Sequence, residues 1–192
     1  MPGKFKNLSY TARGNSNLGG IARLVLFAES DFNVGTGWPL RADLTTAGEV
    51  TVAPPLKVGV VGAELSFDHG SCRVKSAKKG PLGYQNHEHE VEAKFAGVST
   101  AQLQAVELFF NEGGVAVAYY KNGSRRVFGA SWNPLVIEDS DDSGAKGGDM
   151  NSISFKGKAA DLNFHAPMLA TTVVLPTDAT AVKAMPFVVV TA

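Results

Sequence analysis

The fold of this chain is decided by the stretch from His87 to Gly129, which reads HEHEVEAKFAGVSTAQLQAVELFFNEGGVAVAYYKNGSRRVFG. Val91, Ala93 and Phe95 alternate with charged residues at the start of this stretch. A period of two puts the three apolar side chains on one face of a strand and the charged side chains on the other. The stretch therefore opens, over residues 88–96, with a strand that has one buried and one charged face.

A single helix is predicted to follow over residues 99–112. Ser99 can cap its first turn, and Gln102 three residues later completes a capping box. Apolar residues recur between them and the end at helical spacing, which gives the helix one buried stripe. Gly113 and Gly114 then supply the stop.

A hairpin completes the stretch. Two apolar runs, residues 115–120 and 126–130, flank Asn122-Gly123, and Asn-Gly between strand-like runs is the strongest short hairpin signal. One helix among many strands predicts a mainly β fold, a β-sandwich or barrel with one flanking α-helix, a long loop and extended terminal arms.

The rest of the chain extends this unit into one domain. We expect an N-terminal arm in residues 1–20, a β-sandwich or barrel domain in residues 21–165 with a long loop at 29–57, and C-terminal strands or an arm in residues 166–192. Alternating or apolar runs predict further strands at residues 21–27, 49–52, 57–68, 71–75, 135–137 and 151–156, whereas the acidic, glycine-rich residues 138–149 predict a solvated loop.

The charge of the chain is balanced, with 18 Lys and Arg against 18 Asp and Glu. A general nucleic-acid binder usually carries a basic excess, so this balance disfavours that class, and low net repulsion favours self-association. Cys72 is the single cysteine, which excludes an intramolecular disulfide. We find neither a secretory signal nor an apolar run long enough for a membrane helix, so no membrane partner is expected.

The sequence offers little catalytic chemistry. It lacks the nucleophile elbow, the P-loop, the dinucleotide fingerprint and the zinc-protease motif, so we expect no enzyme and no cofactor. His87 and His89 are weak metal candidates because alternate strand residues project to one side. A third ligand could come from His69, His165 or Asp68. The simpler interpretation is a polar strand end.

Several segments then follow one another in an order that resembles a known family. They are Asn17-Leu-Gly-Gly-Ile21, Lys79-Gly-Pro-Leu-Gly-Tyr84 leading into His89-Glu-Val-Glu-Ala-Lys-Phe95, the helix at 99–112, the hairpin with Asn122-Gly123, and residues 141–157. Over residues 17–165 this order resembles virion structural proteins of tailed bacteriophages, above all tail tube (major tail) proteins.

This resemblance implies a β-sandwich or barrel that forms hexameric rings, which stack into a tube that conducts DNA. The implied partners are further copies of the chain, other phage tail or neck proteins, and passing DNA held without sequence specificity. The implied location is the virion tail, assembled in the host cytoplasm. Trp38 and Leu40 in the long loop are candidates for inter-ring contact, and Glu90, Glu92 and Lys94 are candidates for lining the lumen.

Two alternatives remain open. A tail terminator, a neck protein or the tube of a contractile injection system would have the same origin. A small-molecule or carbohydrate-binding β-barrel is a different class, and it is suggested by the aromatic residues Trp38, Trp132, Tyr119 and Tyr120.

Overall fold

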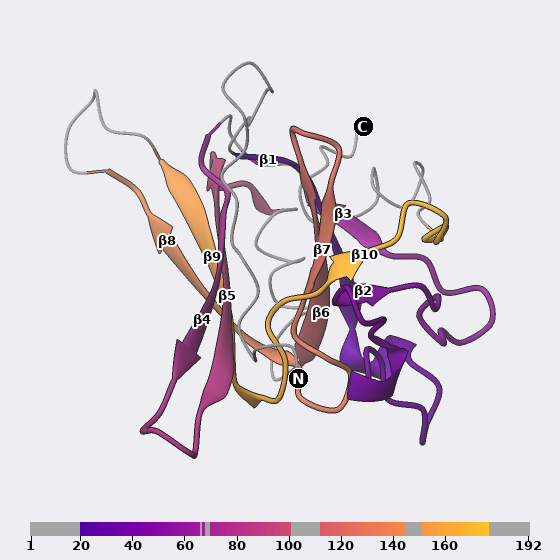
Figure 1. Ribbon diagram of the computed structural model, residues 1–192. Coiled ribbons are helices and arrows are strands. Elements are labelled where there is room, and N and C mark those ends of the chain that lie inside the picture. The colour runs from indigo at the N-terminus through magenta and orange to yellow at the C-terminus, as the bar shows by residue number, and fades with distance from the viewer. Residues whose placement is uncertain (1–19, 66, 68–69, 101–111, 145–150, 177–192) are drawn as a thin grey trace.

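The computed structural model describes residues 20–65, 67, 70–100, 112–144 and 151–176, which form one ten-stranded sheet that curls into two facing parts (Figure 1). The expected mainly β architecture is confirmed. Within these residues no helix has the length and apolar character needed to cross a bilayer. The elements are β1 (Ile21–Ala28), the 3-10 helices η1 (Glu29–Asp31) and η2 (Arg41–Asp43), β2 (Glu49–Val50), β3 (Ala63–Leu65), β4 (Arg73–Lys79), β5 (Asn86–Ala96), β6 (Gly113–Tyr120), β7 (Arg125–Phe128), β8 (Leu135–Asp142), β9 (Ser152–Leu162) and β10 (Met168–Leu169).

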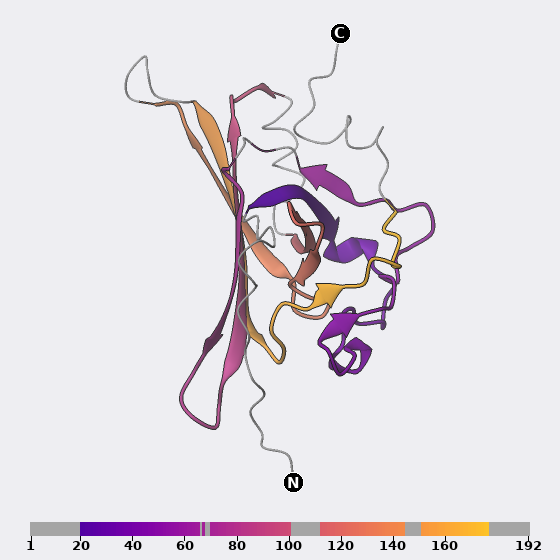
Figure 2. The ribbon, with the colours of Figure 1, turned by 45° about the horizontal axis from the view of Figure 1, so that its top comes forward.

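The sheet divides where β6 meets β8. The strand order is β2-β10-β7-β6-β8-β9-β5-β4, with β1 also paired to β6 and β3 paired to β1. β6 pairs with β8 only at Gly113 and Gly114. We call β3, β1, β6, β7, β10 and β2 the central sheet, and β8, β9, β5 and β4 the outer sheet. Figure 2 shows the outer sheet standing beside the central one, as the layers of a sandwich do.

The main core lies between these two sheets. Alternate residues of each strand point into it, so the inward face predicted for the strand at residues 88–96 is confirmed. The central sheet contributes Leu24, Leu26, Ala116, Ala118 and Phe128, and the outer sheet contributes Val91, Ala93, Phe95, Ile153 and Phe155. Ala63 and Leu65 of β3 join them, as the alternation in residues 57–68 predicts.

A second apolar layer covers the opposite face of the central sheet. Val25, Phe27, Val115, Val117 and Val127 project to that side, where Phe32, Trp38, Val50, Leu169 and Val173 pack against them. The covering residues come from the long loop and from the chain after β9. The central sheet is therefore buried on both faces, and the long loop is part of the fold.

Arg125 fastens the C-terminal part of this layer. The residue is 9% exposed, and its guanidinium donates to the carbonyl oxygens of Val173, at 2.9 Å, and of Ala170. It also lies 5.7 Å from the centre of the Tyr119 ring. Residues 166–176 thus pack onto the domain, whereas residues 177–192 of the predicted C-terminal segment lie outside the described residues.

The predicted hairpin is confirmed, but Gly123 alone of its Asn-Gly pair takes the positive φ that the commonest two-residue hairpin turn requires of both residues. The Tyr120 amide donates to the Ser124 carbonyl at 2.8 Å, and Gly123 takes a φ of 84°. Among the described residues Asp161 is the one non-glycine with positive φ, so Asn122 keeps a negative φ. This is the pattern of a type I turn followed by a left-handed glycine.

Several predicted boundaries are wrong. Of the strand predicted over residues 57–68, β3 covers Ala63–Leu65, and residues 57–62 belong to no named strand. The strand predicted over residues 71–75 runs on to Lys79.

The loop predicted from residue 138 begins as strand instead, since β8 continues to Asp142 in register with β9 as far as Ser152. β9 itself runs on to Leu162, well past the predicted end at Lys156. Backbone pairing between the two strands outweighs the low strand propensity of their Asp residues. Most of the predicted helix (residues 101–111) and nearly all of the N-terminal arm (residues 1–19) lie outside the described residues.

Truncating the second layer should destabilise the fold. Leu169 is 2% exposed beneath the central sheet, so we expect Leu169→Ala to lower the free energy of unfolding by about 2–5 kcal/mol. Leu82→Ala is the matched control because Leu82 is 93% exposed, and it should change stability little. Urea denaturation measures both. Equal effects would show that residues 166–176 do not belong to the core.

Candidate functional site

The outward side of the outer sheet carries a lattice of opposite charges, which we call the charged face. One row across the strands reads Arg73, Glu92, Lys156 and Glu138, and the next reads Lys75, Glu90 and Lys158. Charges therefore alternate in sign from strand to strand. Cross-strand neighbours of opposite charge attract one another and help to hold the register.

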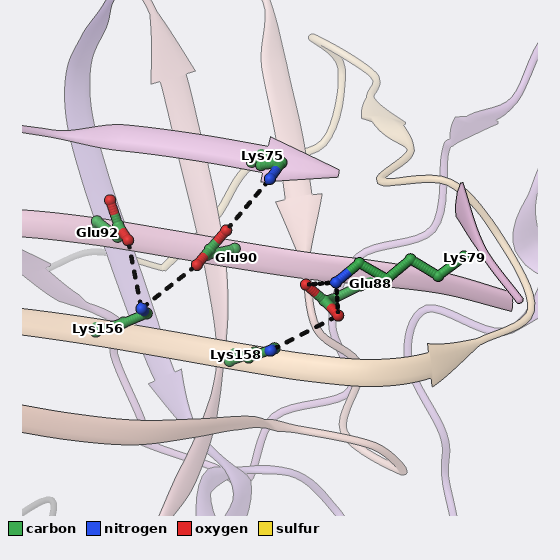
Figure 3. Close-up of polar contacts among 7 residues, drawn as sticks. All are labelled: Lys75, Lys79, Glu88, Glu90, Glu92, Lys156 and Lys158. Atoms are coloured by element: carbon green, nitrogen blue, oxygen red, sulfur yellow. Dashed lines mark hydrogen bonds and ion pairs between the residues drawn. The ribbon is translucent and has the colours of Figure 1, made fainter. Parts of the chain in front are cut away.

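Five ion pairs join these side chains across three strands (Figure 3). Lys156 of β9 reaches both Glu90 and Glu92 of β5, with Nζ to oxygen distances of 3.6 Å. Lys75 of β4 lies 3.9 Å from the other oxygen of Glu90. A carboxylate oxygen of Glu88 lies 2.8 Å from Nζ of Lys79 and 3.7 Å from Nζ of Lys158. Glu88 and Glu90 thus each bridge β4 to β9, and Lys156 joins two glutamates of β5.

Glu88 makes the shortest ion pair of this lattice. The hydrogen bond from the Lys79 ammonium, helped by the nearby charge of Lys158, keeps the pKa of Glu88 below its ordinary value despite partial burial. Glu88 is therefore ionised at neutral pH.

The charged face combines many charges with little net field. Each lysine drawn in Figure 3 lies within ion-pair distance of a glutamate. Alternating charges this close cancel at longer range, and salt screens what remains beyond about 8 Å. A phosphate chain moving along such a surface would meet a polar, hydrated wall without a strong attraction.

The residues predicted to line a lumen lie on this face. Glu90 and Glu92 are in the lattice, and Lys94 follows on the same side of β5 opposite Ser154 of β9. Lys158 of β9 was missed because the strand was predicted to end at Lys156, and the pairing of Lys156 with Glu90 and Glu92 depends on β9 lying beside β5. The alternation of Phe155, Gly157 and Ala159 with Lys156 and Lys158 was the available signal.

The two outermost strands of this sheet carry opposite charge. β4 has Arg73, Lys75, Lys78 and Lys79, and within the described residues it pairs with β5 alone. β8 has Glu138, Asp139, Asp141 and Asp142, all exposed, and beyond Val136 its pairing among those residues is with β9 alone. One free edge is basic and the other acidic. The β4–β5 and β8–β9 pairs also project toward opposite ends of the sheet (Figure 2).

The two predicted metal ligands do not share a site. The ring of His89 is fully buried, where its Nδ1 accepts from the Gly129 amide at 3.1 Å and its Nε2 lies 3.3 Å from the Phe164 carbonyl. His87 lies beyond a register shift in β5, with its ring 5.5 Å from that of His165. Within the described ranges, no three His, Cys, Asp or Glu side chains form a metal-sized group. His69 and Asp68 lie outside those ranges.

The two loop residues proposed for inter-ring contact differ in their exposure. Trp38 is 1% exposed, stacks on Phe32 and donates from its indole nitrogen to the Val52 carbonyl at 2.9 Å. It anchors the loop to the core. Leu40 is 42% exposed, so the predicted contact role stays with Leu40.

The four aromatic residues that suggested a binding barrel are not gathered around one cavity. Trp38 is in the core, and Arg23 lies 5.1 Å above the Tyr119 ring. Trp132 lines an open cavity of about 820 Å³ with Glu29, Val34 and Glu112. The aromatic platform expected of a carbohydrate site is not formed by these four side chains.

Comparisons with protein-family models, with curated proteins and with solved structures found no match to this chain.

His89 should make stability depend on pH. Burial lowers its pKa from 6.5 to about 4. Between these two pH values the imidazole is protonated in the unfolded chain and neutral in the folded chain. The free energy of unfolding should therefore fall as the pH is lowered through this window, with a slope approaching about 1.4 kcal/mol per pH unit.

The measurement is urea denaturation at a series of pH values, with His89→Gln and His165→Gln as the paired variants. Burial and Arg126 lower the pKa of His165 as well, but His89 has the larger shift. We expect His89→Gln to flatten the slope more than His165→Gln. A slope unchanged by His89→Gln would contradict the assignment.

Proposed function

We propose that this chain is a structural, non-enzymatic subunit of a self-assembling tube, the tail tube (major tail) protein of a tailed bacteriophage. Its copies would form rings, six per ring by the resemblance of the sequence, and the rings would stack into a channel for DNA. The observation that carries the proposal is the outer sheet, which has a balanced charged face and two free edges of opposite charge.

The directions of the strands suit a ring. Each neighbouring pair in the order β8-β9-β5-β4 is antiparallel. In a ring of identically oriented copies, β4 of one copy would meet β8 of the next in antiparallel orientation as well. Such head-to-tail contacts close into rings when the rotation between copies permits. Closure would pair both free edges and remove the aggregation hazard that open edges carry.

The placement of the free edges supports a tilted barrel. Arg73, at the start of β4, lies in the same row as Glu138, and the two strands extend from that row in opposite directions. Overlap of β4 with a neighbouring β8 therefore needs an offset along the strand axis. Closed barrels require this kind of stagger between their strands.

In such a barrel the charged face would line the lumen, because the other face of the outer sheet is filled by the core. Glu90, Glu92 and Lys94 would then face the passing DNA. Their lattice neutralises lysines in place, so the wall would conduct DNA with little retention. Arg125 is buried and contributes no charge to this wall.

Contacts between rings would come from parts that protrude along the strand axis. The turn between β4 and β5 exposes Leu82 and Tyr84, at 93% and 81%, and the long loop exposes Leu40. Apolar side chains presented at protruding tips are common at protein interfaces. Other tail or neck proteins would cap the tube in the virion, after assembly in the host cytoplasm.

The first test is imaging of the purified protein by negative-stain electron microscopy over a concentration series, with light scattering for mass. We expect rings or tubes with a central channel. A single ring that does not stack at any concentration would favour a tail terminator or neck protein. A monomer of 20.2 kDa at every concentration would contradict the proposal.

Charge reversal tests the edge contact directly. On the charged face, Glu138→Lys with Asp142→Lys would place lysines along β8 as well as along β4, and Arg73→Glu with Lys75→Glu would place glutamates along β4 beside the acidic side chains of β8. Each double variant should lose assembly, because like charges would face each other across the new strand pair. Mixing the two variants should restore it, since every contact then joins a basic edge to an acidic one.

Lys121→Glu is the control, because Lys121 lies in the β6–β7 turn of the central sheet, away from both edges. It should assemble as the unchanged protein does. Circular dichroism and thermal melts show whether each variant folds. Folded double variants that assemble alone, or a mixture that stays dissociated, would overturn the β4–β8 contact.

A further inference from the structure

A second cavity lies at the edge of the central sheet, on the side where β10 lies between β7 and β2 (Figure 1). Its volume is about 660 Å³, and η2, the turn at residues 44–48 and the chain after β9 form its walls. Arg41, Arg126 and His165 line it, together with the hydroxyl residues Thr45 and Thr46. No Asp or Glu is among its lining residues.

Both arginines of this cavity are held by neutral groups. Arg126 donates from Nε and Nη2 to the Ala166 carbonyl, at 3.1 and 2.7 Å, and from Nη2 to Nδ1 of His165 at 2.8 Å. Arg41 donates from Nη1 to the Asn163 carbonyl at 3.1 Å. In the part of the chain that the structure describes, neither guanidinium forms an ion pair with a carboxylate.

More basic side chains lie behind the cavity wall. The ring of His87 contacts that of His165, and Lys78 lies opposite His87 in the β4–β5 register. The Nδ1 of His87 is buried and has no hydrogen-bond partner among the described residues. Burial, followed by His165, Lys78 and Arg41, lowers the pKa of His87, and burial with Arg126 lowers that of His165. Among the described residues, basic side chains gather here with no carboxylate in the lining of the cavity.

The neutral ring of His165 has a hydrogen-bond donor of its own, in addition to those of the two arginines. Its Nδ1 accepts from Arg126, so the proton of the neutral ring is on Nε2. The cavity therefore combines two guanidinium groups, an imidazole N–H and hydroxyl groups. Tetrahedral oxyanions are recognised by donors of these kinds, and guanidinium forks suit phosphate in particular.

We propose that this cavity binds a phosphate group, with Arg41 and Arg126 as the charged donors and His165 as a neutral one. A dianion would satisfy both guanidinium groups at once, whereas one carboxylate would compensate only one positive charge. The ligand is either the free ion or a phosphomonoester. The inference does not depend on the assembly proposed above, because the cavity is formed within one copy of the chain.

The test is isothermal titration of the full chain with inorganic phosphate, and separately with glycerol phosphate, against sodium chloride at matched ionic strength. Arg41→Gln removes a charged donor whose side chain is exposed and makes one hydrogen bond in the structure. Lys121→Gln is the control, because Lys121 is an exposed cation in the β6–β7 turn and does not line the cavity. We expect saturable binding by the unchanged protein and by Lys121→Gln, and binding weaker by about tenfold or more in Arg41→Gln.

Nuclear magnetic resonance of the imidazole groups supplies a second readout. A bound anion favours the charged form of a nearby histidine, so phosphate should raise the titration midpoints of His87 and His165 and leave buried His89 less affected. Tighter binding of glycerol phosphate would identify an esterified ligand, and tighter binding of inorganic phosphate a free ion. Either result supports the site. Heat and midpoint changes that chloride reproduces, or equal affinity in Arg41→Gln and Lys121→Gln, would overturn it.

Discussion

β6 has no side that faces water along most of its length, because Gly114 to Ala118 are buried and their side chains alternate between two cores. A strand of this kind needs an apolar layer on each face. The outer sheet supplies one layer, and the long loop with the chain after β9 supplies the other. Trp38 and Arg125 fix the second layer in place, the first by packing and an indole hydrogen bond, the second by donating to two carbonyl oxygens.

The outer sheet is left with a different set of constraints. Its inner face packs into the core through residues such as Val91 and Phe155. Its outward face and its two edges bear mainly charged and polar side chains. Charges can therefore occupy these surfaces at little cost, and they are arranged in alternating rows with Lys156 at the centre. A neutral chain can in this way present one basic edge and one acidic edge, which is the polarity that head-to-tail assembly needs.

Arg125 and Arg126 show how the fold divides neighbouring residues between two tasks. Because side chains alternate along β7, Arg125 projects with Val127 toward the second layer, and Arg126 projects with Phe128 toward the other side. The Arg125 guanidinium is buried and binds the carbonyl oxygens of Val173 and Ala170. The Arg126 guanidinium reaches the rim of the sheet, where it meets His165 and the loop carrying Arg41. The basic Arg-Arg pair is thus neither a surface patch nor a single site.

The sequence by itself determined the β character, the inward faces of β3 and β5 and the hairpin at Gly123, because alternation and turn chemistry are local properties that could be predicted from neighbouring residues. The glutamates of the charged face could be predicted for the same reason. Tertiary structure alone decided that β8 and β9 extend to Asp142 and Leu162, that Trp38 is a core residue, and that Arg41, Arg126 and His165 line one cavity with His87 against His165. These features depend on strand pairing and packing between distant segments, which no local pattern encodes.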